Sequence, residues 1–420
     1  MIIPIALQRL TRDAWLLFAT RSIRLFAYGS VSVVLVFYLI GLGLTESQTG
    51  LVLTLTLIGD TIVSLALTTR ADRLGRRRML MAGAALMAAA GLAFAATTNF
   101  WLLIAAGTIG VISPSGNEVG PFLSIEQAAL SHVVTDRTRT EVFAWYTLTG
   151  SLATALGALA GGALTGALQQ AGWTAVGGYR AIVILYAALG VALALLFTSL
   201  SPAAEAGPQR ERISGRTTLA GLSGLDRSRR VVMKLSGLFA LDSFGGGFVV
   251  QSFAAYWFYL RFGVDPGTLG VIFFSANVLA GISALLASRL AARFGLIRTM
   301  VATHLPSNVL LILVPLMPNL RLATIVLLVR FSISQMDVPT RQSYVMAVVS
   351  PEERSAAAGI TGVARTIGAA ISPLFVGFMF ARPSLINLPF FLAGMLKIIY
   401  DLLLYREFVA VQPPEEVRGS

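Results

Sequence analysis

The feature that most constrains this chain is a series of long apolar segments separated by charged or Gly- and Pro-containing stretches. A membrane-spanning helix needs about 20 apolar residues, and these segments have that length or more. Their apolar character is continuous, whereas the strands of a membrane barrel alternate polar and apolar residues. We therefore predict an all-α integral membrane protein with twelve transmembrane helices, over residues 15–44, 48–69, 79–97, 100–130, 142–168, 179–200, 232–260, 268–290, 297–317, 321–349, 355–381 and 385–408.

The low charge content supports this prediction. Only 12% of the 420 residues are charged and 56% are hydrophobic, whereas about 25% of a soluble chain is charged. A soluble enzyme, a disordered chain and a disulfide scaffold are excluded. The chain has no cysteine, which excludes thiol catalysis and thiolate metal sites. Since it also has no phosphate-binding loop and no clustered metal ligands, we expect neither ATP hydrolysis nor a metal or cofactor.

The basic residues indicate how the helices are oriented. Of the 32 Lys and Arg residues, 22 lie in loops on one side of the predicted helices and four on the other. Because cytoplasmic loops carry the basic excess, we expect a multi-pass plasma-membrane protein (inner membrane in a bacterium) with both termini in the cytoplasm. The net charge of +12 then needs no nucleic-acid partner. The one long polar loop predicts three regions: a six-helix bundle (1–200), a cytoplasmic linker (201–231) and a second six-helix bundle (232–420).

The two predicted bundles resemble each other in sequence. Four residues of the first half recur in the second half at one constant offset of 220 residues: Gly43, Gly50, Gly75 and Arg78 match Gly263, Gly270, Gly295 and Arg298. Further along, Gln127, Val133, Val134 and Arg139 match Gln342, Val348, Val349 and Arg354 at an offset of 215. The fourth helix therefore carries extra residues around 116–125, in a Pro- and Gly-rich stretch where freed backbone groups could bind a ligand. Two related six-helix halves are typical of alternating-access transporters.

Residues 71–78, between the second and third helices, read ADRLGRRR. This resembles the signature loop of the major facilitator superfamily: an acid, a base, glycine and a basic cluster. The resemblance implies two pseudo-symmetric bundles that rock around a central site. It also implies a gating role for Asp72, with Arg73 and Arg76 to Arg78 as its partners. The second copy has Ala292 in place of the acid.

Residues 157–162 of the fifth helix read GALAGG. They resemble the antiporter motif of drug:proton exporters, with alanine where that motif has proline. The alternative is close helix packing through small residues. Residues 104–110 of the fourth helix lack the arginine that exporters often carry there. The motif favours export without establishing it.

Twelve charged residues, six of each sign, lie inside the predicted helices. Such residues are costly in a bilayer and mark functional sites or ion pairs. Seven lie near mid-depth: Asp60, Glu118, Asp242, Arg330, Asp337, Arg365 and Lys397. Five lie nearer the cytoplasmic side: Arg21, Arg24, Glu126, Arg341 and Asp401.

The resemblance implies that helices 1, 4, 7 and 10 line the central pathway, which places Glu118, Asp242, Arg330 and Asp337 there. The carboxylates of Glu118, Asp242 and Asp337 could each bind the coupled proton. The alternative for each is a permanent salt bridge with Arg330 or Arg365. Those two arginines could instead hold an anionic group. Gln251 and Asn277 could add hydrogen bonds to a substrate.

Spacing predicts two further contacts. Asp337 and Arg341 are four residues apart, as are Lys397 and Asp401, a spacing that allows an ion pair on a helix. We interpret the second pair as structural, since helix 12 is an outer helix in this family. His304 lies in helix 9, another outer helix, where we expect no metal or proton role.

The sequence thus predicts a secondary active transporter that acts as a single chain and draws on a proton gradient, without a cofactor. Its partners are a small molecule, protons and the bilayer. The first hypothesis is export of a small organic or amphipathic compound in exchange for protons. Open alternatives are proton symport of an anionic metabolite, export of a divalent metal and a lipid flippase. The motifs do not identify the substrate.

Overall fold

The computed structural model describes residues 10–117, 120–134, 139–205, 228–350 and 353–410, and the regular elements in these ranges are helices. The first half contains α2 (Arg12–Gly41), α3 (Glu46–Leu74), α4 (Arg76–Ala96), α5 (Phe100–Ile109), α6 (Phe122–Val133), α7 (Arg139–Gln170) and α8 (Ala175–Phe197). The second contains α9 (Arg229–Gly247), α10 (Gln251–Phe262), α11 (Pro266–Phe294), α12 (Leu296–Leu313), α13 (Leu320–Phe331), α14 (Asp337–Val348), α15 (Arg354–Phe380) and α16 (Leu388–Phe408).

Ten helical segments of the described chain are long and apolar enough to cross a membrane, with α9 and α10 counted as one. The two remaining predicted spans are each formed by two shorter helices, α5 with α6 and α13 with α14. The break in the first of these spans was expected from its extra residues and is confirmed. The prediction of a continuous span over 321–349 was wrong. Pro339 lies in the first turn of α14, where proline is tolerated. In a continuous helix its ring would clash with the backbone carbonyl four residues earlier, so the helix breaks before it.

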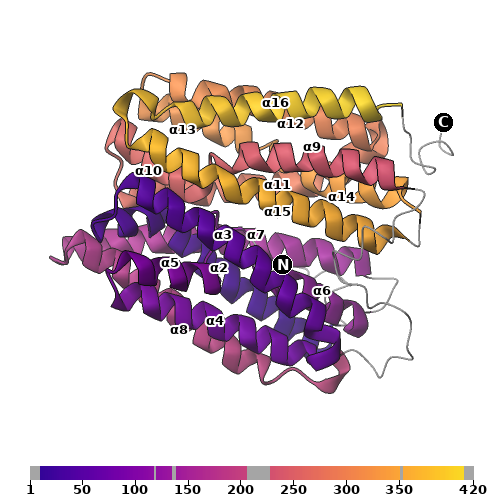
Figure 1. Cartoon of the computed structure of the whole chain (residues 1–420), viewed down its shortest axis with the longest axis horizontal. Helices are drawn as coiled ribbons and strands as arrows, with labels where there is room; N and C mark the ends of the chain where they lie inside the picture. Colours follow the sequence, from indigo (N-terminus) through magenta and orange to yellow (C-terminus); the bar gives the residue numbers. More distant parts are fainter. Residues whose placement is uncertain (1–9, 118–119, 135–138, 206–227, 351–352, 411–420) are drawn as a thin grey trace, which may run out of the picture. The chain divides into compact units, whose positions relative to one another are not determined.

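The chain forms two compact units. The first comprises Met1–Arg212 with Gln251–Asn277, and the second comprises Ile213–Val250 with Val278–Ser420. Corresponding pairs of helices pack together in the two units. In the first unit α2 lies along α7 and α4 along α8, and in the second unit α9 lies along α15 and α12 along α16 (Figure 1).

Glycines bring α2 and α7 together. A Cβ atom on Gly157 would lie 2.1 Å from the carbonyl oxygen of Phe26, and one on Gly161 would lie 2.6 Å from that of Ser30. Both positions therefore need glycine for the backbones to approach this closely. Helix packing thus accounts for these two glycines of the 157–162 motif without an export function.

The internal repeat also has a structural basis. Gly75 and Gly295, at the junctions α3–α4 and α11–α12, have φ angles of 102° and 85°. Gly43 and Gly263, near the starts of α3 and α11, have φ angles of 95° and 67°. Since side chains disfavour this left-handed region, the matched glycines mark matched turns.

Candidate functional site

The predicted gating loop contacts the start of the linker. Gly75 ends α3, and the Glu205 carboxylate accepts hydrogen bonds from the backbone N–H groups of Arg76 (2.6 Å) and Arg77 (3.1 Å) at the start of α4. The Arg76 guanidinium donates to the carbonyl of Ala204 (3.3 Å). A carboxylate is stabilised at this positive end of a helix.

The remaining predicted gating residues are Asp72, Arg73 and Arg78. Arg73 and Arg78 are exposed, and the side chain of Asp72 lies outside the described part of the chain. Glu205 was not among the predicted site residues. It is one of three acids in the linker 201–231, with Glu211 and Asp226, so its position in the sequence does not single it out.

The break between α5 and α6 uses its freed backbone carbonyls inside the protein. The carbonyl of Pro114 accepts from the N–H of Ser252 (3.1 Å), and that of Gly116 accepts from the hydroxyl of Thr154 (3.3 Å). The carbonyl of Val111 accepts from Tyr186. Each of these three carbonyls thus already accepts a hydrogen bond from within the protein. Glu118, the acid predicted for this stretch, lies outside the described residues.

Gln251 and Asn277, both predicted to bind substrate, lie together in the first unit. The amide nitrogen of Gln251 donates to the Ser32 hydroxyl of α2 (2.8 Å), and its amide oxygen accepts from the amide nitrogen of Asn277 (3.1 Å). The three side chains thus form a hydrogen-bonded chain across α10, α2 and α11. Both ends of the Gln251 amide are occupied in it.

The second unit holds the main charged cluster. Asp242 of α9 is 5% exposed and accepts from two cations: Lys397 of α16 reaches Oδ1 (2.6 Å) and Arg341 of α14 reaches Oδ2 (2.9 Å). Arg341 also lies 3.3 Å from Asp337, so the pair predicted from their spacing is confirmed. Asp337 begins α14, where the helix dipole stabilises a carboxylate. Asp337 is thus paired as its spacing predicted, whereas Asp242 is paired with Lys397 and Arg341 and not with Arg330 or Arg365.

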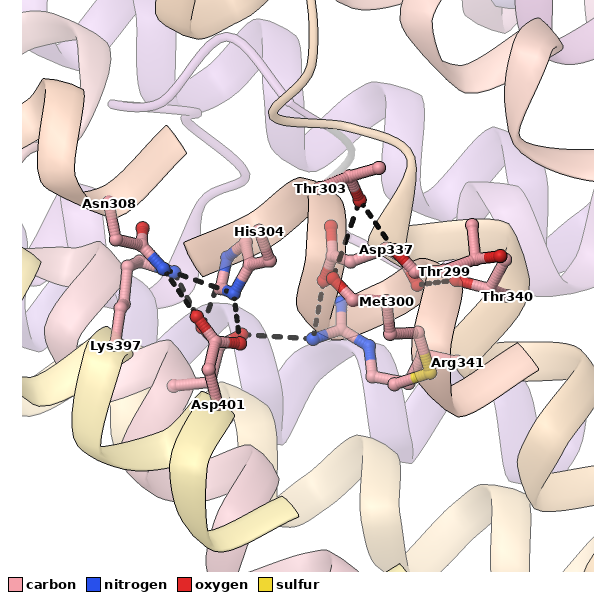
Figure 2. A network of polar contacts seen from close by, with 11 residues as sticks. Thr299, Met300, Thr303, His304, Asn308, Asp337, Thr340, Arg341, Lys397 and Asp401 are labelled. Carbon is pink, nitrogen blue, oxygen red and sulfur yellow. Dashed lines mark hydrogen bonds and ion pairs between the residues drawn. The ribbon is translucent and has the colours of Figure 1, made fainter. Parts of the chain in front are cut away.

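A buried histidine extends this cluster, and Figure 2 shows His304 next to Asp401 and Asn308. His304 Nδ1 lies 2.7 Å from Oδ1 of Asp401, and the Asn308 amide donates to its Oδ2 (2.9 Å). His304 Nε2 lies 3.8 Å from Oδ1 of Asp242. Lys397 and Asp401, expected to pair along α16, instead face Asp242 and His304. Spacing along one helix could not reveal these partners, since they lie on other helices.

Two arginines of the second unit differ from the rest of the cluster. Arg330 of α13 and Arg365 of α15 form no ion pair with a described carboxylate, and the Nε atom of each is buried without a hydrogen-bond partner. Arg330 lies over the ring of Phe331, 4.9 Å from its centroid. Positive charge inside the second unit is therefore incompletely neutralised by the side chains that the structure describes.

The first unit contains a contrasting ion pair. Arg24 of α2 and Glu126 of α6 are both fully buried and meet through two hydrogen bonds of 2.7 and 2.8 Å. Glu126 also accepts from Thr20 (3.1 Å) and from Tyr146 (2.5 Å). Arg21 lies over the Tyr146 ring, 4.4 Å from its centroid. The Glu126 carboxylate is thus fully satisfied.

Comparisons with known proteins agree with this architecture. The family model described as Major Facilitator Superfamily matches residues 17–332 and 235–419. An uncharacterized membrane protein of Saccharomyces cerevisiae is 32% identical over 426 residues, which cover 96% of this chain and 95% of that protein.

Solved structures of transporters share the fold. A nucleoside transporter has a TM-score of 0.73 at 14% identity, with 94% of this chain and 100% of that chain covered. A D-xylose-proton symporter has a TM-score of 0.70 at 15% identity, with 94% and 97% covered. A human organic anion transporter has a TM-score of 0.65 at 16% identity, with 96% and 100% covered.

Proposed function

Because the chain belongs to the major facilitator superfamily of membrane transporters, we propose that it carries a small organic anion together with a proton across the membrane. The chain is a multi-pass membrane transporter of small molecules and not an enzyme. The anionic substrate, the proton and action as a single chain are our proposals. Export in exchange for protons, which the sequence favoured, stays a prediction.

The observation that carries the proposal is the state of Arg365. Its side chain is half-buried in a helix long and apolar enough to span the membrane, and its Nε atom has no hydrogen-bond partner. A cation within a membrane-spanning helix is costly without an ion pair, and a bound carboxylate or phosphate can offset that cost through paired hydrogen bonds. Arg330, in the same state, adds to the positive charge.

The neighbouring cluster supports an anion over a cation. Asp242 and Asp337, the two described acids among the predicted site residues, are already held by Lys397 and Arg341. Among the described residues, no group of three or more acidic or histidine side chains is arranged to hold a metal ion. Both observations make the anion the better match.

Uptake into proteoliposomes tests this function. Radiolabelled lactate, succinate and benzoate are compared with uncharged and cationic analogues of similar size, with and without an imposed proton gradient. We expect proton-driven accumulation of at least one carboxylate and none of the cations. Accumulation of the cations alone, or movement of the carboxylate against the proton, would overturn the proposal and favour export by antiport. Transfer of a fluorescent phospholipid between leaflets would favour a flippase.

Variants of Arg365 then test the anchor. Arg365→Gln removes the charge, and we expect carboxylate transport to fall about 10- to 100-fold, as for loss of a charge-assisted hydrogen bond. Arg365→Lys keeps the charge and retains part of the activity. The matched control is Arg321→Gln, because Arg321 is an exposed arginine at the start of α13. Equal transport by Arg365→Gln and the control would refute the anchoring role.

A further inference from the structure

We propose that His304 binds the coupled proton, held between Asp401 and Asp242. This inference deepens the proposed function and rests on it for the link to substrate. His304 belongs to α12 and is 5% exposed, while Asp401 is 1% exposed and Asn308 is fully buried. Figure 2 shows the imidazole surrounded by polar side chains of α12 and α16.

The geometry around the imidazole favours two ring protons. Nδ1 lies 2.7 Å from Asp401, and Nε2 lies 3.8 Å from Asp242, so a carboxylate faces each nitrogen. A neutral imidazole has a single N–H donor and turns a lone pair toward one of the two acids, whereas an imidazolium presents an N–H to each of them. Asp401 then lies at hydrogen-bond distance and Asp242 at ion-pair distance. Asn308 fixes the second oxygen of Asp401 (2.9 Å) and keeps that carboxylate facing the ring.

The charges of the connected network point the same way. Three carboxylates (Asp242, Asp337 and Asp401) are joined by ion pairs and hydrogen bonds to two permanent cations (Arg341 and Lys397). Within this network a proton on His304 makes the two signs equal, which favours the proton in a buried site. Arg330 and Arg365 belong to the same unit but lie outside the network, and their positive charge opposes that proton.

Neighbouring cations weaken proton binding at His304, and two of them lie where we propose that substrate binds. Lys397 shares Oδ1 of Asp242 with His304, and Arg341 binds the other oxygen. Tyr400 of α16 packs edge-on against the imidazole, with ring centroids 5.9 Å apart. The unpaired charges of Arg330 on α13 and Arg365 on α15 belong to the same unit.

An anion bound at Arg365 would neutralise one of the charges that oppose the proton. Substrate binding therefore strengthens proton binding, and by thermodynamic reciprocity the proton strengthens substrate binding. Positive coupling of this kind is what proton–anion symport requires.

Nuclear magnetic resonance tests proton binding without any substrate. The chain has two histidines, so histidine-selective ¹⁵N labelling of the full-length His132→Gln variant leaves the ring signals of His304 alone. We expect these signals to change between the imidazolium and the neutral pattern when the pH is varied. A ring that keeps one pattern at every pH at which the protein stays folded would overturn the inference.

Two further variants test the network, with opposite expected signs. Asp401→Asn removes an acid that favours the proton, and we expect a smaller imidazolium fraction at a fixed pH. Lys397→Met removes a cation that opposes it, and we expect a larger fraction. Unchanged fractions in both variants would contradict the proposed electrostatic origin.

Transport assays separate this inference from the proposed function. For a carboxylate that the wild type accumulates, we expect His304→Gln to keep exchange of labelled for unlabelled compound while proton-driven accumulation falls about tenfold. Full accumulation by His304→Gln would overturn the proton role. If the wild type exchanges none of the panel carboxylates, the proposed function fails, whereas the proton-binding result stands on its own. His132→Gln is the transport control.

Discussion

The two units differ in how their buried charged side chains are paired. In the first unit Arg24 and Glu126 form a closed pair, with both carboxylate oxygens bonded to one arginine and further bonded to Thr20 and Tyr146. In the second unit Asp242 is shared among Lys397, Arg341 and His304, and Arg341 is shared with Asp337. A carboxylate held on both oxygens by one arginine favours a single structure. A shared carboxylate can lose one partner and keep another, which is the property that a coupling site needs.

The largest effect that tests this contrast is expected in the closed pair. Glu126→Gln removes the carboxylate charge that holds the fully buried Arg24 through two hydrogen bonds, and we expect the free energy of unfolding to fall by about 3–5 kcal/mol. Denaturation in mixed detergent micelles, followed by circular dichroism, measures it. The double variant Arg24→Met/Glu126→Leu restores most of the loss, because an apolar pair carries no buried charge. Transport by the folded double variant at the wild-type rate would confirm a purely structural role; loss of transport would contradict the contrast.

In the second unit we expect a smaller loss of stability and a larger loss of function. Asp242→Asn removes one partner of Arg341, which retains Asp337 at 3.3 Å, and removes the ion-pair partner of Lys397. The free energy of unfolding should fall by about 2–4 kcal/mol. Adding Lys397→Met recovers part of this stability, and proton-driven accumulation remains absent. Recovery of accumulation along with stability would show that the shared cluster is structural like the closed pair.

The origin of this contrast could be predicted from the sequence only in part. Apolar length predicted the helices, and the constant offset predicted matched turns such as Gly75 and Gly295. Spacing along one helix also predicted the Asp337–Arg341 pair, since both residues share one face. The partners of Lys397 and Asp401 depend on how α9, α12 and α16 pack, and no periodicity encodes that. His304 was dismissed because helix 9 is an outer helix, although a buried imidazole can reach acids on two neighbouring helices.

The matched junctions extend the comparison to the loops. At the start of α4 the Glu205 carboxylate accepts hydrogen bonds from two backbone N–H groups, and Arg298 lies at the matched start of α12. We expect Glu205→Gln to reduce the free energy of unfolding by about 1–2 kcal/mol through loss of the charge at the helix N-terminus. Hydrogen exchange should accelerate at the amides of Arg76 and Arg77 and stay unchanged at Arg298. Unchanged exchange at the start of α4 would show that Glu205 does not hold this junction.

The smallest expected effect distinguishes two matched helix starts. Thr45 caps α3 by accepting from the N–H of Gln48 (3.2 Å), and 220 residues later Asp265 accepts from the N–H of Thr268 (3.0 Å) before α11. The Thr268 hydroxyl, which also donates to Asp265 (2.6 Å), lowers the pKa of that carboxyl below its ordinary value. Asp265 lies between two spans, and its replacement by alanine should cost about 1 kcal/mol, as for other N-caps.

The pH dependence follows from the sign of that pKa shift. A lowered pKa in the folded state gives stability that is fully present above the pKa of the unfolded chain, about 3.9, and is lost as the pH falls through the folded value. The difference in stability between wild type and Asp265→Asn should therefore shrink on acidification below about pH 4. The difference between wild type and Thr45→Ala should stay constant over the same range, since threonine does not titrate. Parallel pH profiles for the two variants would show that the Asp265 cap acts through its shape and not through its charge.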